Sequence, residues 1–237
     1  MDIQQLIEFD KSLLLTLNGN NSLFLDGFMW TVTSTLTWIP AILMLLYVIF
    51  KNNKVNDSIL IIAMVGVTIL LADQFASGIC KPFFGRLRPT QDPDIMNMLH
   101  VVNGYRGGTY GFISSHAANT FGVAMFVTLI IKNWGLGIMM FIWAAIPSYS
   151  RIYLGVHYPG DILCGAIAGC IIALISYFTY QYIKGKIFSV EHNQYVSNQY
   201  TRSGYESSDI NLLHLILILT YFYAIINGMI IAKVFHF

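Results

Sequence analysis

Three short polar stretches interrupt an otherwise apolar chain, and they concentrate charged and nucleophilic side chains. Residues 81–89 read Lys-Pro-Phe-Phe-Gly-Arg-Leu-Arg-Pro, and residues 114–116 read Ser-Ser-His. Residues 150–161 read Ser-Arg-Ile-Tyr-Leu-Gly-Val-His-Tyr-Pro-Gly-Asp. Because an unpaired ion in hydrocarbon costs at least a few kcal/mol, charges placed beside apolar segments indicate a functional site.

The basic residues of these stretches are suited to binding a phosphate group. A phosphate monoester carries close to two negative charges, and its transition state places more charge on the equatorial oxygens. Several fixed donors, preferably planar guanidinium groups, are needed to bind it. Lys81, Arg88 and Arg151 provide them, and Arg86 offers an additional contact. Any one of them could instead be a snorkelling side chain at a helix end, but their grouping with histidines favours a site.

The histidines supply what metal-free hydrolysis of a phosphate ester needs: a nucleophile, a group that orients it, and an acid. His157 precedes Asp161 by four residues, and the turn between them can fold the carboxylate back toward the ring. A carboxylate bonded to one ring nitrogen makes the other a better nucleophile. His116, at the head of a separate expected helix, is the candidate acid. Ser114 and Ser115, with the N–H groups of that helix start, offer donors to anionic oxygens.

A zinc site is the natural alternative, since two histidines and an aspartate can bind zinc. The neighbouring cations raise the cost of holding a divalent ion, and no third ligand shares the spacing, so we expect no metal and no cofactor. Asp73 lies within an apolar stretch, where we expect it to pair with a motif cation or to make a polar contact between helices. The remaining histidines are interpreted as structural: His100, His192, His214 and His236.

The composition is that of an integral membrane protein. The chain of 237 residues is 56% hydrophobic and 11% charged, whereas soluble domains carry about 25% charged residues. A net charge of +1 argues against nucleic acid as a partner. The cysteines lie in apolar segments and show neither disulfide nor metal spacing. No cleavable signal peptide is expected, because the N-terminus lacks a basic flank followed by an apolar run.

Apolar stretches that approach the roughly 20 residues of a bilayer crossing must position the motifs. We expect about six transmembrane helices, near residues 28–50, 58–80, 114–132, 136–155, 161–183 and 211–235. Pro40 and Pro147 fall inside them and should kink them. Residues 1–22 carry apolar side chains at helical spacing, which predicts an amphipathic helix in the membrane interface, with a tilted extra span as the alternative. The predicted fold is thus an all-α polytopic membrane helix bundle, forming a single membrane domain over residues 1–237.

Alternation of the spans places the motif loops and both termini on one side of the membrane. The other side is predicted to be cytoplasmic, because it carries a group of cations. They are Lys51, Lys54, Lys132, Lys184, Lys186 and Arg202. We therefore expect an integral cytoplasmic (inner) membrane protein with its active site facing the periplasm or the outside. Residues 187–209 are expected to form a polar loop.

Together the motifs resemble those of the type 2 phosphatidic acid phosphatase (PAP2) superfamily. The pattern Lys-x6-Arg-Pro runs from Lys81 to Pro89, and Ser-Arg-x5-His-x3-Asp runs from Ser150 to Asp161. The usual Pro-Ser-Gly-His of the second motif reads Ile-Ser-Ser-His, so its serine and histidine are present while proline and glycine are replaced. The core of the resemblance covers about residues 28–183. The helix expected near 211–235 is additional and is assigned to packing or oligomerisation.

The resemblance implies a role for each motif residue. His157 would attack phosphorus and form a phosphohistidine, Asp161 would orient it, and His116 would protonate the leaving group and later activate water. The phosphate oxygens would be bound by Lys81, Arg88, Ser114, Ser115 and Arg151. No metal would be required.

The sequence therefore predicts a metal-independent membrane lipid phosphatase acting on a lipid phosphate or pyrophosphate. The candidate substrates are polyprenyl pyrophosphate, phosphatidylglycerol phosphate, phosphatidic acid and a lipid A phosphate, with tails entering between helices. The compact motif loops favour a small headgroup over a sugar phosphate. Two alternatives stay open: a lipid phosphotransferase on the same frame, and a non-enzymatic anion or lipid transport protein. A transporter would usually show paired broken helices in two halves, and the sequence shows no such symmetry.

Overall fold

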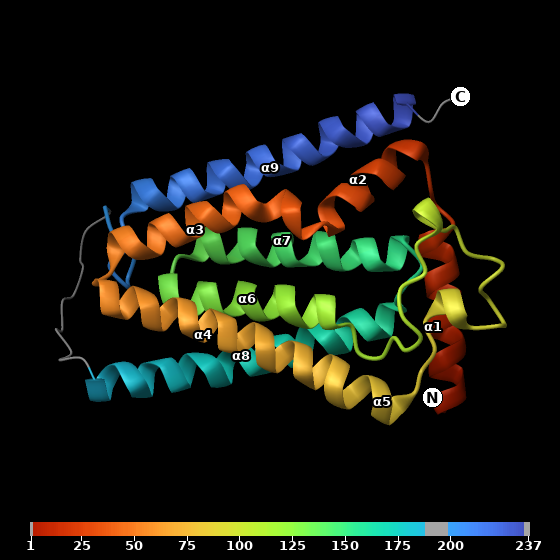
Figure 1. Cartoon of the computed structure of the whole chain (residues 1–237), viewed down its shortest axis with the longest axis horizontal. Coiled ribbons are helices and arrows are strands. Elements are labelled where there is room, and N and C mark those ends of the chain that lie inside the picture. Colours follow the sequence, from red (N-terminus) through yellow and green to blue (C-terminus); the bar gives the residue numbers. More distant parts are fainter. Residues whose placement is uncertain (1, 188–198, 235–237) are drawn as a thin grey trace.

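The computed structural model describes residues 2–187 and 199–234, and within these ranges the chain is helical with connecting loops and no named strand. The long helices run side by side, and α1 lies across one end of the bundle (Figure 1). The predicted all-α membrane bundle is confirmed. Residues 188–198 of the expected polar loop, which include His192, lie outside the described residues, as does His236.

The amphipathic N-terminal segment forms α1 (Ile3–Asn18), which begins with a capping box at Asp2. Phe9 is 59% exposed, whereas Leu14 is fully buried against the bundle. A helix that is apolar outward and crosses the end of the bundle (Figure 1) fits the interfacial position predicted for it rather than an extra span.

The first expected span is divided into two helices. α2 (Leu23–Thr33) ends before Ser34, the 3-10 turn η1 (Thr35–Trp38) follows, and α3 (Ile39–Asn52) runs to the far end of the bundle. The prediction that Pro40 kinks a continuous helix is wrong, because this proline lies in the first turn of α3, where no N–H donor is needed. The break instead precedes the proline, at Ser34.

The second expected span carries the first motif out of the bundle. α4 (Val55–Asp73) continues through the π-helical segment η2 (Gln74–Cys80) into α5 (Lys81–Phe84). π-helical segments often occur at functional sites, and this one directly precedes the motif lysine. Gly85 ends α5 in a left-handed conformation, with φ of 57°, and the chain then enters the long motif-bearing loop.

Four more helices follow, and the other motifs lie at the same end of the bundle as the first (Figure 1). They are α6 (Ser115–Ile131), α7 (Trp134–Tyr153), α8 (Pro159–Ile187) and α9 (Ser207–Val234). α6 begins at the second motif, and the third motif spans the end of α7, the following turn and the start of α8. Pro147 lies inside α7, as predicted. The ends of the described chain also lie at this end of the bundle, as the alternation of spans predicts.

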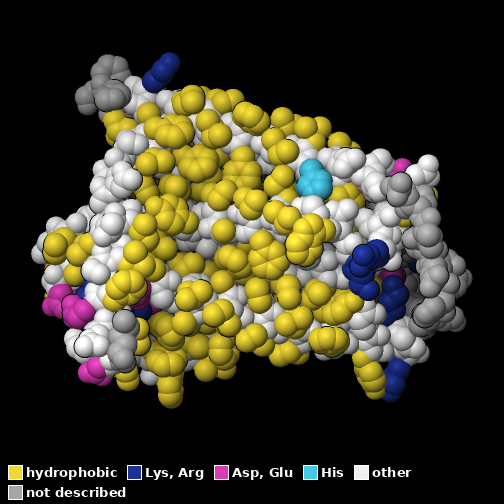
Figure 2. Space-filling model, turned by 180° about the vertical axis from the view of Figure 1, so that it is seen from behind, with side chains coloured by type: hydrophobic (Ala, Val, Ile, Leu, Met, Phe, Trp, Pro, Cys, Tyr) yellow, Lys and Arg dark blue, Asp and Glu magenta, His cyan; other side chains and the backbone are white. Residues whose placement is uncertain are grey.

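The lipid-facing surface is broadly apolar. Figure 2 shows a band of hydrophobic side chains across one face, with charged side chains gathered toward the two ends. Among the described residues, four stretches are long and apolar enough to cross a membrane, and Ser115–Ile131 is a shorter apolar helix. The four are Thr35–Asn52, Val55–Phe84, Pro159–Lys186 and Ser207–Lys233. The count of about six spans stays a prediction.

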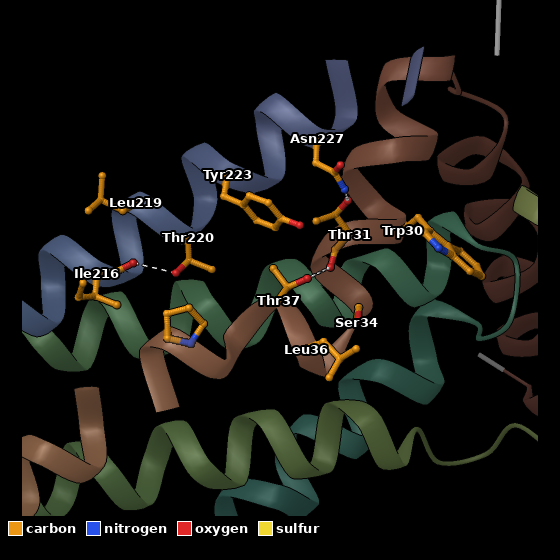
Figure 3. Close-up of a pocket in the computed structure, with 11 residues that line it drawn as sticks. Trp30, Thr31, Ser34, Leu36, Thr37, Ile216, Leu219, Thr220, Tyr223 and Asn227 are labelled. Atoms are coloured by element: carbon orange, nitrogen blue, oxygen red, sulfur yellow. Dashed lines mark hydrogen bonds between the residues drawn. The ribbon is translucent and has the colours of Figure 1, made fainter. Parts of the chain in front are cut away.

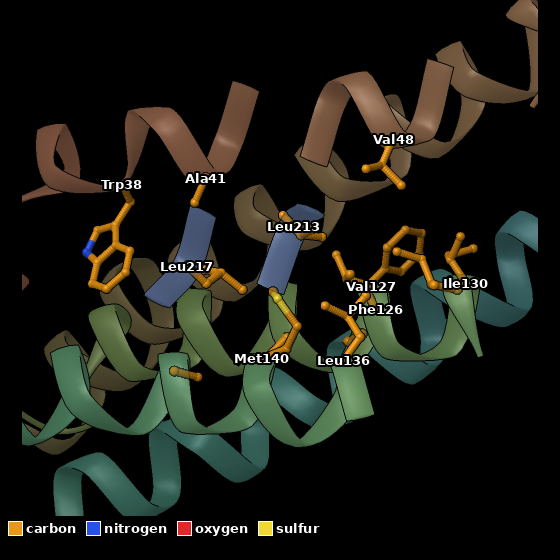
Figure 4. Close-up of a cluster of buried hydrophobic side chains, with 14 of the residues drawn as sticks. Trp38, Ala41, Val48, Phe126, Val127, Ile130, Leu136, Met140, Leu213 and Leu217 are labelled. Carbon is orange, nitrogen blue, oxygen red and sulfur yellow. The ribbon is translucent and has the colours of Figure 1, made fainter. Parts of the chain in front are cut away.

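α9 packs on the rest of the bundle at two levels. Near its start, Leu213 and Leu217 join a buried cluster with side chains of α3, α6 and α7 (Figure 4). Further along, Asn227 Nδ2 donates to Thr31 Oγ1 of α2 at 2.8 Å. Between these levels α9 and the break after α2 enclose a groove of about 550 Å³ (Figure 3). These contacts support a packing role for this helix.

α6 and α8 make the closest helix contact at the motif end. A Cβ atom at Gly165 would lie 2.5 Å from the carbonyl oxygen of Ser114, and one at Gly169 would lie 2.1 Å from that of Ala118. Small residues permit such approach between membrane helices. The contact fixes the start of α6, which carries the second motif, against the start of α8, which carries the end of the third.

Substitution of Gly169 tests this contact. Gly169→Ala has to push α6 away from α8, because the added methyl group meets backbone rather than a movable side chain. We expect a loss of roughly 1–3 kcal/mol in stability, measured as a lower Tm in detergent. Gly66→Ala on α4 is the control, since a Cβ there meets nothing within 4 Å. Equal Tm values for the two variants would contradict the close packing.

Candidate active site

His157 and Asp161 form a buried pair in the turn between α7 and α8. His157 Nδ1 lies 3.2 Å from Asp161 Oδ2, and the two side chains are 2% and 0% exposed. The same oxygen accepts the N–H of Tyr158 at 3.0 Å. The structure thus brings together the two residues that the sequence pairs. Because Nδ1 holds its proton toward the carboxylate, the lone pair of the ring lies on Nε2.

The free ring nitrogen faces a guanidinium group. Arg88 Nη1 lies 3.2 Å from His157 Nε2 and also donates to the carbonyl oxygen of Val156 at 3.2 Å. A guanidinium group can only donate, which again places the lone pair on Nε2. Burial, opposed by Asp161 and reinforced by Arg88, lowers the pKa of His157 to about 4. The ring is therefore neutral at neutral pH.

Arg151 lies in the last turn of α7 and is held by residues that the sequence did not single out. Its Nη1 donates to Thr33 Oγ1 at 2.9 Å, and its Nη2 donates to Tyr105 OH at 3.0 Å. Its buried Nε has no hydrogen-bond partner among the described residues. No sequence signal marks Thr33, the last residue of α2, or Tyr105, in the loop before α6, because both are far from Arg151 in the sequence.

Lys81 is tied to the second motif. Its Nζ donates to Ser115 Oγ and to Ser77 Oγ, each at 3.1 Å. Ser77 in turn donates to Asp73 Oδ1 at 3.4 Å. The expected pairing of Asp73 with a motif cation is therefore indirect, through a serine one helical turn away.

The start of α6 positions the other residues of the second motif. Ser114 caps this helix, since its Oγ accepts the N–H of Ala117 at 3.3 Å, and its own N–H donates to the carbonyl oxygen of Asp161 at 3.0 Å. His116 Nε2 is buried and has no hydrogen-bond partner among the described residues. The second motif is thus bonded directly to the residue that orients His157.

His116 lines an apolar groove of about 380 Å³. The walls come from α3 and α4, including Ile42, Leu45, Val65 and Ile69, and the floor comes from α6 and α7. The larger groove beside α9 contains no motif residue. The groove at His116 is therefore the one that joins the chemistry to the lipid-facing surface.

Arg86 does not face His157. Its Nη1 donates to Asp161 Oδ1 at 3.0 Å, and its Nη2 donates to Asp10 Oδ2 at 2.8 Å. Its guanidinium carbon lies 3.9 Å from the centre of the Tyr158 ring. The sequence offered Arg86 as an additional phosphate contact, but the structure places it between two carboxylates. No sequence signal connects Asp10 of α1 with this site.

The charges around the two histidines are mostly positive. Among the described residues, no group of three or more His, Cys, Asp or Glu side chains is placed to hold a metal ion. Instead three cations reach the site from three parts of the chain: Lys81 from α5, Arg88 from the loop after α5, and Arg151 from α7. This arrangement can bind an anion next to a neutral, oriented imidazole.

The chain is similar to known membrane enzymes. Residues 58–184, which hold all the motifs, match the PAP2 superfamily. Lipid A 4'-phosphatase of Bacteroides thetaiotaomicron is 40% identical over 74% of this chain and 79% of its own length. Lipid A 4'-phosphatase of Porphyromonas gingivalis is 35% identical over 78% of each chain. Undecaprenyl-diphosphatase of Sulfolobus acidocaldarius is 30% identical over 73% of this chain and 79% of its own length.

A solved structure shares the fold. The crystal structure of the transmembrane PAP2 type phosphatidylglycerolphosphate phosphatase from Bacillus subtilis matches with a TM-score of 0.56 at 21% identity. The match covers 79% of this chain and 90% of that one. With the motifs, the bundle and the matched relatives in agreement, the chain belongs to the PAP2 superfamily as an integral membrane phosphatase.

Proposed function

We propose that the protein removes a terminal phosphate from a lipid phosphate through a phosphohistidine, and that the 4'-phosphate of a lipid A is its substrate. The observation that supports the chemistry best is the neutral His157, with Nδ1 held by Asp161 and Nε2 turned toward motif cations. The resemblance to two lipid A 4'-phosphatases supports the substrate. It favours the sugar phosphate over the small headgroup that the compact loops suggested.

In the first step, Nε2 of His157 attacks phosphorus and the bond between phosphorus and the lipid oxygen breaks. The electron pair of that bond leaves with the lipid oxygen, and His116, which takes up a proton when the anionic phosphate binds beside it, donates that proton to the oxygen. Asp161 stabilises the positive charge that develops on the ring of His157. The products of this step are the dephosphorylated lipid and a phosphohistidine.

In the second step, a water molecule attacks the phosphohistidine. His116, now neutral, accepts a proton from the water, the bond between phosphorus and Nε2 breaks, and the ring regains its electron pair. Inorganic phosphate leaves, and the site returns to its starting state. The same residues thus serve both steps without an external oxidant or reductant.

The transferring phosphate is bound by groups from three elements. Arg88 already lies beside Nε2, and Arg151 presents a buried Nε without a partner among the described residues. Lys81 and Ser115 complete the binding groups from the other side of the site. Because these donors are fixed by other contacts, they can stabilise charge on the equatorial oxygens without rearrangement. Ser114 is assigned a smaller part, through the N-cap of α6.

The groove between α3 and α4 is assigned to the lipid tail. His116 lines this groove, so the leaving oxygen, which stays attached to the lipid, emerges next to the acid. His157, in the turn before α8, is not among the residues that line this groove, and we assign its attack to the face of the phosphate opposite the leaving oxygen. An acyl chain in this groove would exchange its contacts with membrane lipid for contacts with apolar protein side chains. Its phosphate headgroup would then lie among the cations.

The active site is assigned to the periplasmic face of the cytoplasmic membrane. The end of the bundle away from the motifs carries Lys51 and Lys184 at the ends of α3 and α8. The positive-inside rule counts such lysines near the ends of spans, even where they pair with acids. Lipid phosphates in the outer leaflet would then reach the motif end directly.

Phosphate release by purified protein tests the proposed reaction. We expect release from lipid A to exceed release from undecaprenyl diphosphate and phosphatidylglycerol phosphate, and to survive EDTA. His157→Ala should lower it at least about 1,000-fold, because the nucleophile is lost. His214→Ala, outside the site on α9, is the control and should keep wild-type activity.

Three results would argue against this reaction. Release that is lost with EDTA, or retained by folded His157→Ala, contradicts the histidine mechanism. Transfer of phosphate to an added alcohol in place of release would favour a phosphotransferase. Lipid binding with no turnover in any variant would favour a transport protein.

A bulky side chain in the groove tests the assignment of the lipid tail. Val65→Trp should raise KM for a long-chain lipid phosphate roughly tenfold, because the indole fills space between α3 and α4. Release from a soluble phosphate ester such as p-nitrophenyl phosphate should change less than about twofold. Val67→Trp, on the same helix but outside the groove and 38% exposed, is the matched control. If Val65→Trp raises KM for the lipid no more than Val67→Trp does, the tail lies elsewhere.

A further inference from the structure

Arg86 is placed so that it balances the charge of the catalytic carboxylate rather than that of a substrate. Both of its terminal nitrogens are occupied, one by Asp161 Oδ1 at 3.0 Å and the other by Asp10 Oδ2 at 2.8 Å. The guanidinium carbon lies over the ring of Tyr158, 3.9 Å from its centre. Arg86 is therefore fixed on three sides by groups that belong to the protein.

Asp10 makes a second contact next to the catalytic carboxylate. Its Oδ1 accepts the N–H of Gly160 at 2.8 Å, and Gly160 is the residue before Asp161. A Cβ atom at Gly160 would lie 2.8 Å from Asp10 Oδ2, so the approach depends on glycine. One carboxylate of α1 thus holds both the arginine and the backbone at the start of α8.

The neighbouring residue of α1 reaches the same segment by another route. Lys11 Nζ lies 2.7 Å from Asp94 and 3.1 Å from Asp92. Asp92 Oδ2 in turn accepts the phenol of Tyr158 at 2.8 Å. Residues 10 and 11 therefore fix the segment 158–161 from two directions, although they are separated from it by about two thirds of the chain.

Burial explains why these contacts matter to Asp161. Its side chain is fully buried, and an ionised carboxylate without a cation in such a place costs several kcal/mol. Without that cation the carboxylate would not stay in place to hold His157 in the reactive tautomer. Asp10 keeps Arg86 in place. If Asp10 were absent, Arg86 would bind only one carboxylate and would be free to turn toward a substrate phosphate.

We propose that Asp10 is a positioning residue for catalysis: by binding Arg86 and the N–H of Gly160, it keeps the guanidinium group on Asp161 and away from the substrate. This inference rests on the proposed function, since it requires His157 as the nucleophile. It extends the active site to α1, a helix that carries none of the motifs. The orientation of the nucleophile then depends on how the interfacial helix is seated on the bundle.

The substitution Asp10→Asn tests the inference. It keeps a side-chain oxygen for Gly160 but removes the charge that faces Arg86. We expect kcat for phosphate release from the lipid to fall about tenfold or more, with KM and inhibition by vanadate changed less than about twofold. Asp10→Glu should recover part of kcat, because it restores the charge. Glu8→Gln, an exposed acid on the same helix, is the control and should match wild type.

Arg86→Lys provides a second, independent variant. A lysine keeps the positive charge, but a single ammonium group cannot reproduce the planar contact with two carboxylates. We expect the same pattern, with lower kcat and unchanged vanadate inhibition. Because both residues act through the same contact, the double variant with Asp10→Asn should lose little more kcat than either single variant. Thermal unfolding in detergent identifies any variant that fails to fold, and the other then decides.

The outcomes separate this inference from the proposed function. Wild-type kcat in folded Asp10→Asn or Arg86→Lys would overturn it. A loss that appears mainly in KM and vanadate inhibition would also overturn it, since Arg86 would then bind the substrate. If the wild-type protein released no phosphate from any lipid, the proposed function itself would be the part that failed.

Discussion

The buried negative charge of Asp161 is the constraint on which the rest of the site depends. Its oxygens accept from His157, the N–H of Tyr158 and Arg86, and its backbone carbonyl accepts the N–H of Ser114. An uncompensated charge at this depth would cost several kcal/mol. Four parts of the chain must therefore meet at Asp161: the turn before α8, the start of α6, the loop after α5, and α1, which reaches it through Arg86. The glycine contacts between α6 and α8 allow that meeting.

From this point the site divides into two functional sides. His157 lies on the buried side, where its orientation is set entirely by protein groups, while His116 lies on the groove side, next to the apolar walls of α3 and α4. The motif cations Lys81, Arg88 and Arg151 are each held by neutral partners, such as Ser115 for Lys81 and Tyr105 for Arg151. A fixed set of donors around a neutral nucleophile can stabilise a transferring phosphate without reorganisation.

Local spacing and hydropathy were enough to predict the bundle, the three motifs and the pairing of His157 with Asp161, because these depend on neighbours in sequence. The break at Ser34 was missed because Pro40 was the stronger local signal. Contacts across the fold were also missed: Thr33 and Tyr105 meet Arg151, and Asp10 meets Arg86, only after helices distant in sequence have packed. The roles of the site residues, the side of the membrane and the number of spans stay predictions.

Trapping the covalent intermediate shows directly whether His157 is the nucleophile. Wild-type protein mixed with a lipid phosphate and rapidly quenched at alkaline pH, where phosphohistidine survives, is digested and analysed by mass spectrometry. We expect one phosphorylated histidine, His157, whose phosphate is lost as inorganic phosphate appears and which is absent from His157→Ala. Phosphate release that proceeds at the wild-type rate with no phosphohistidine, or with the phosphate on His116, would contradict it.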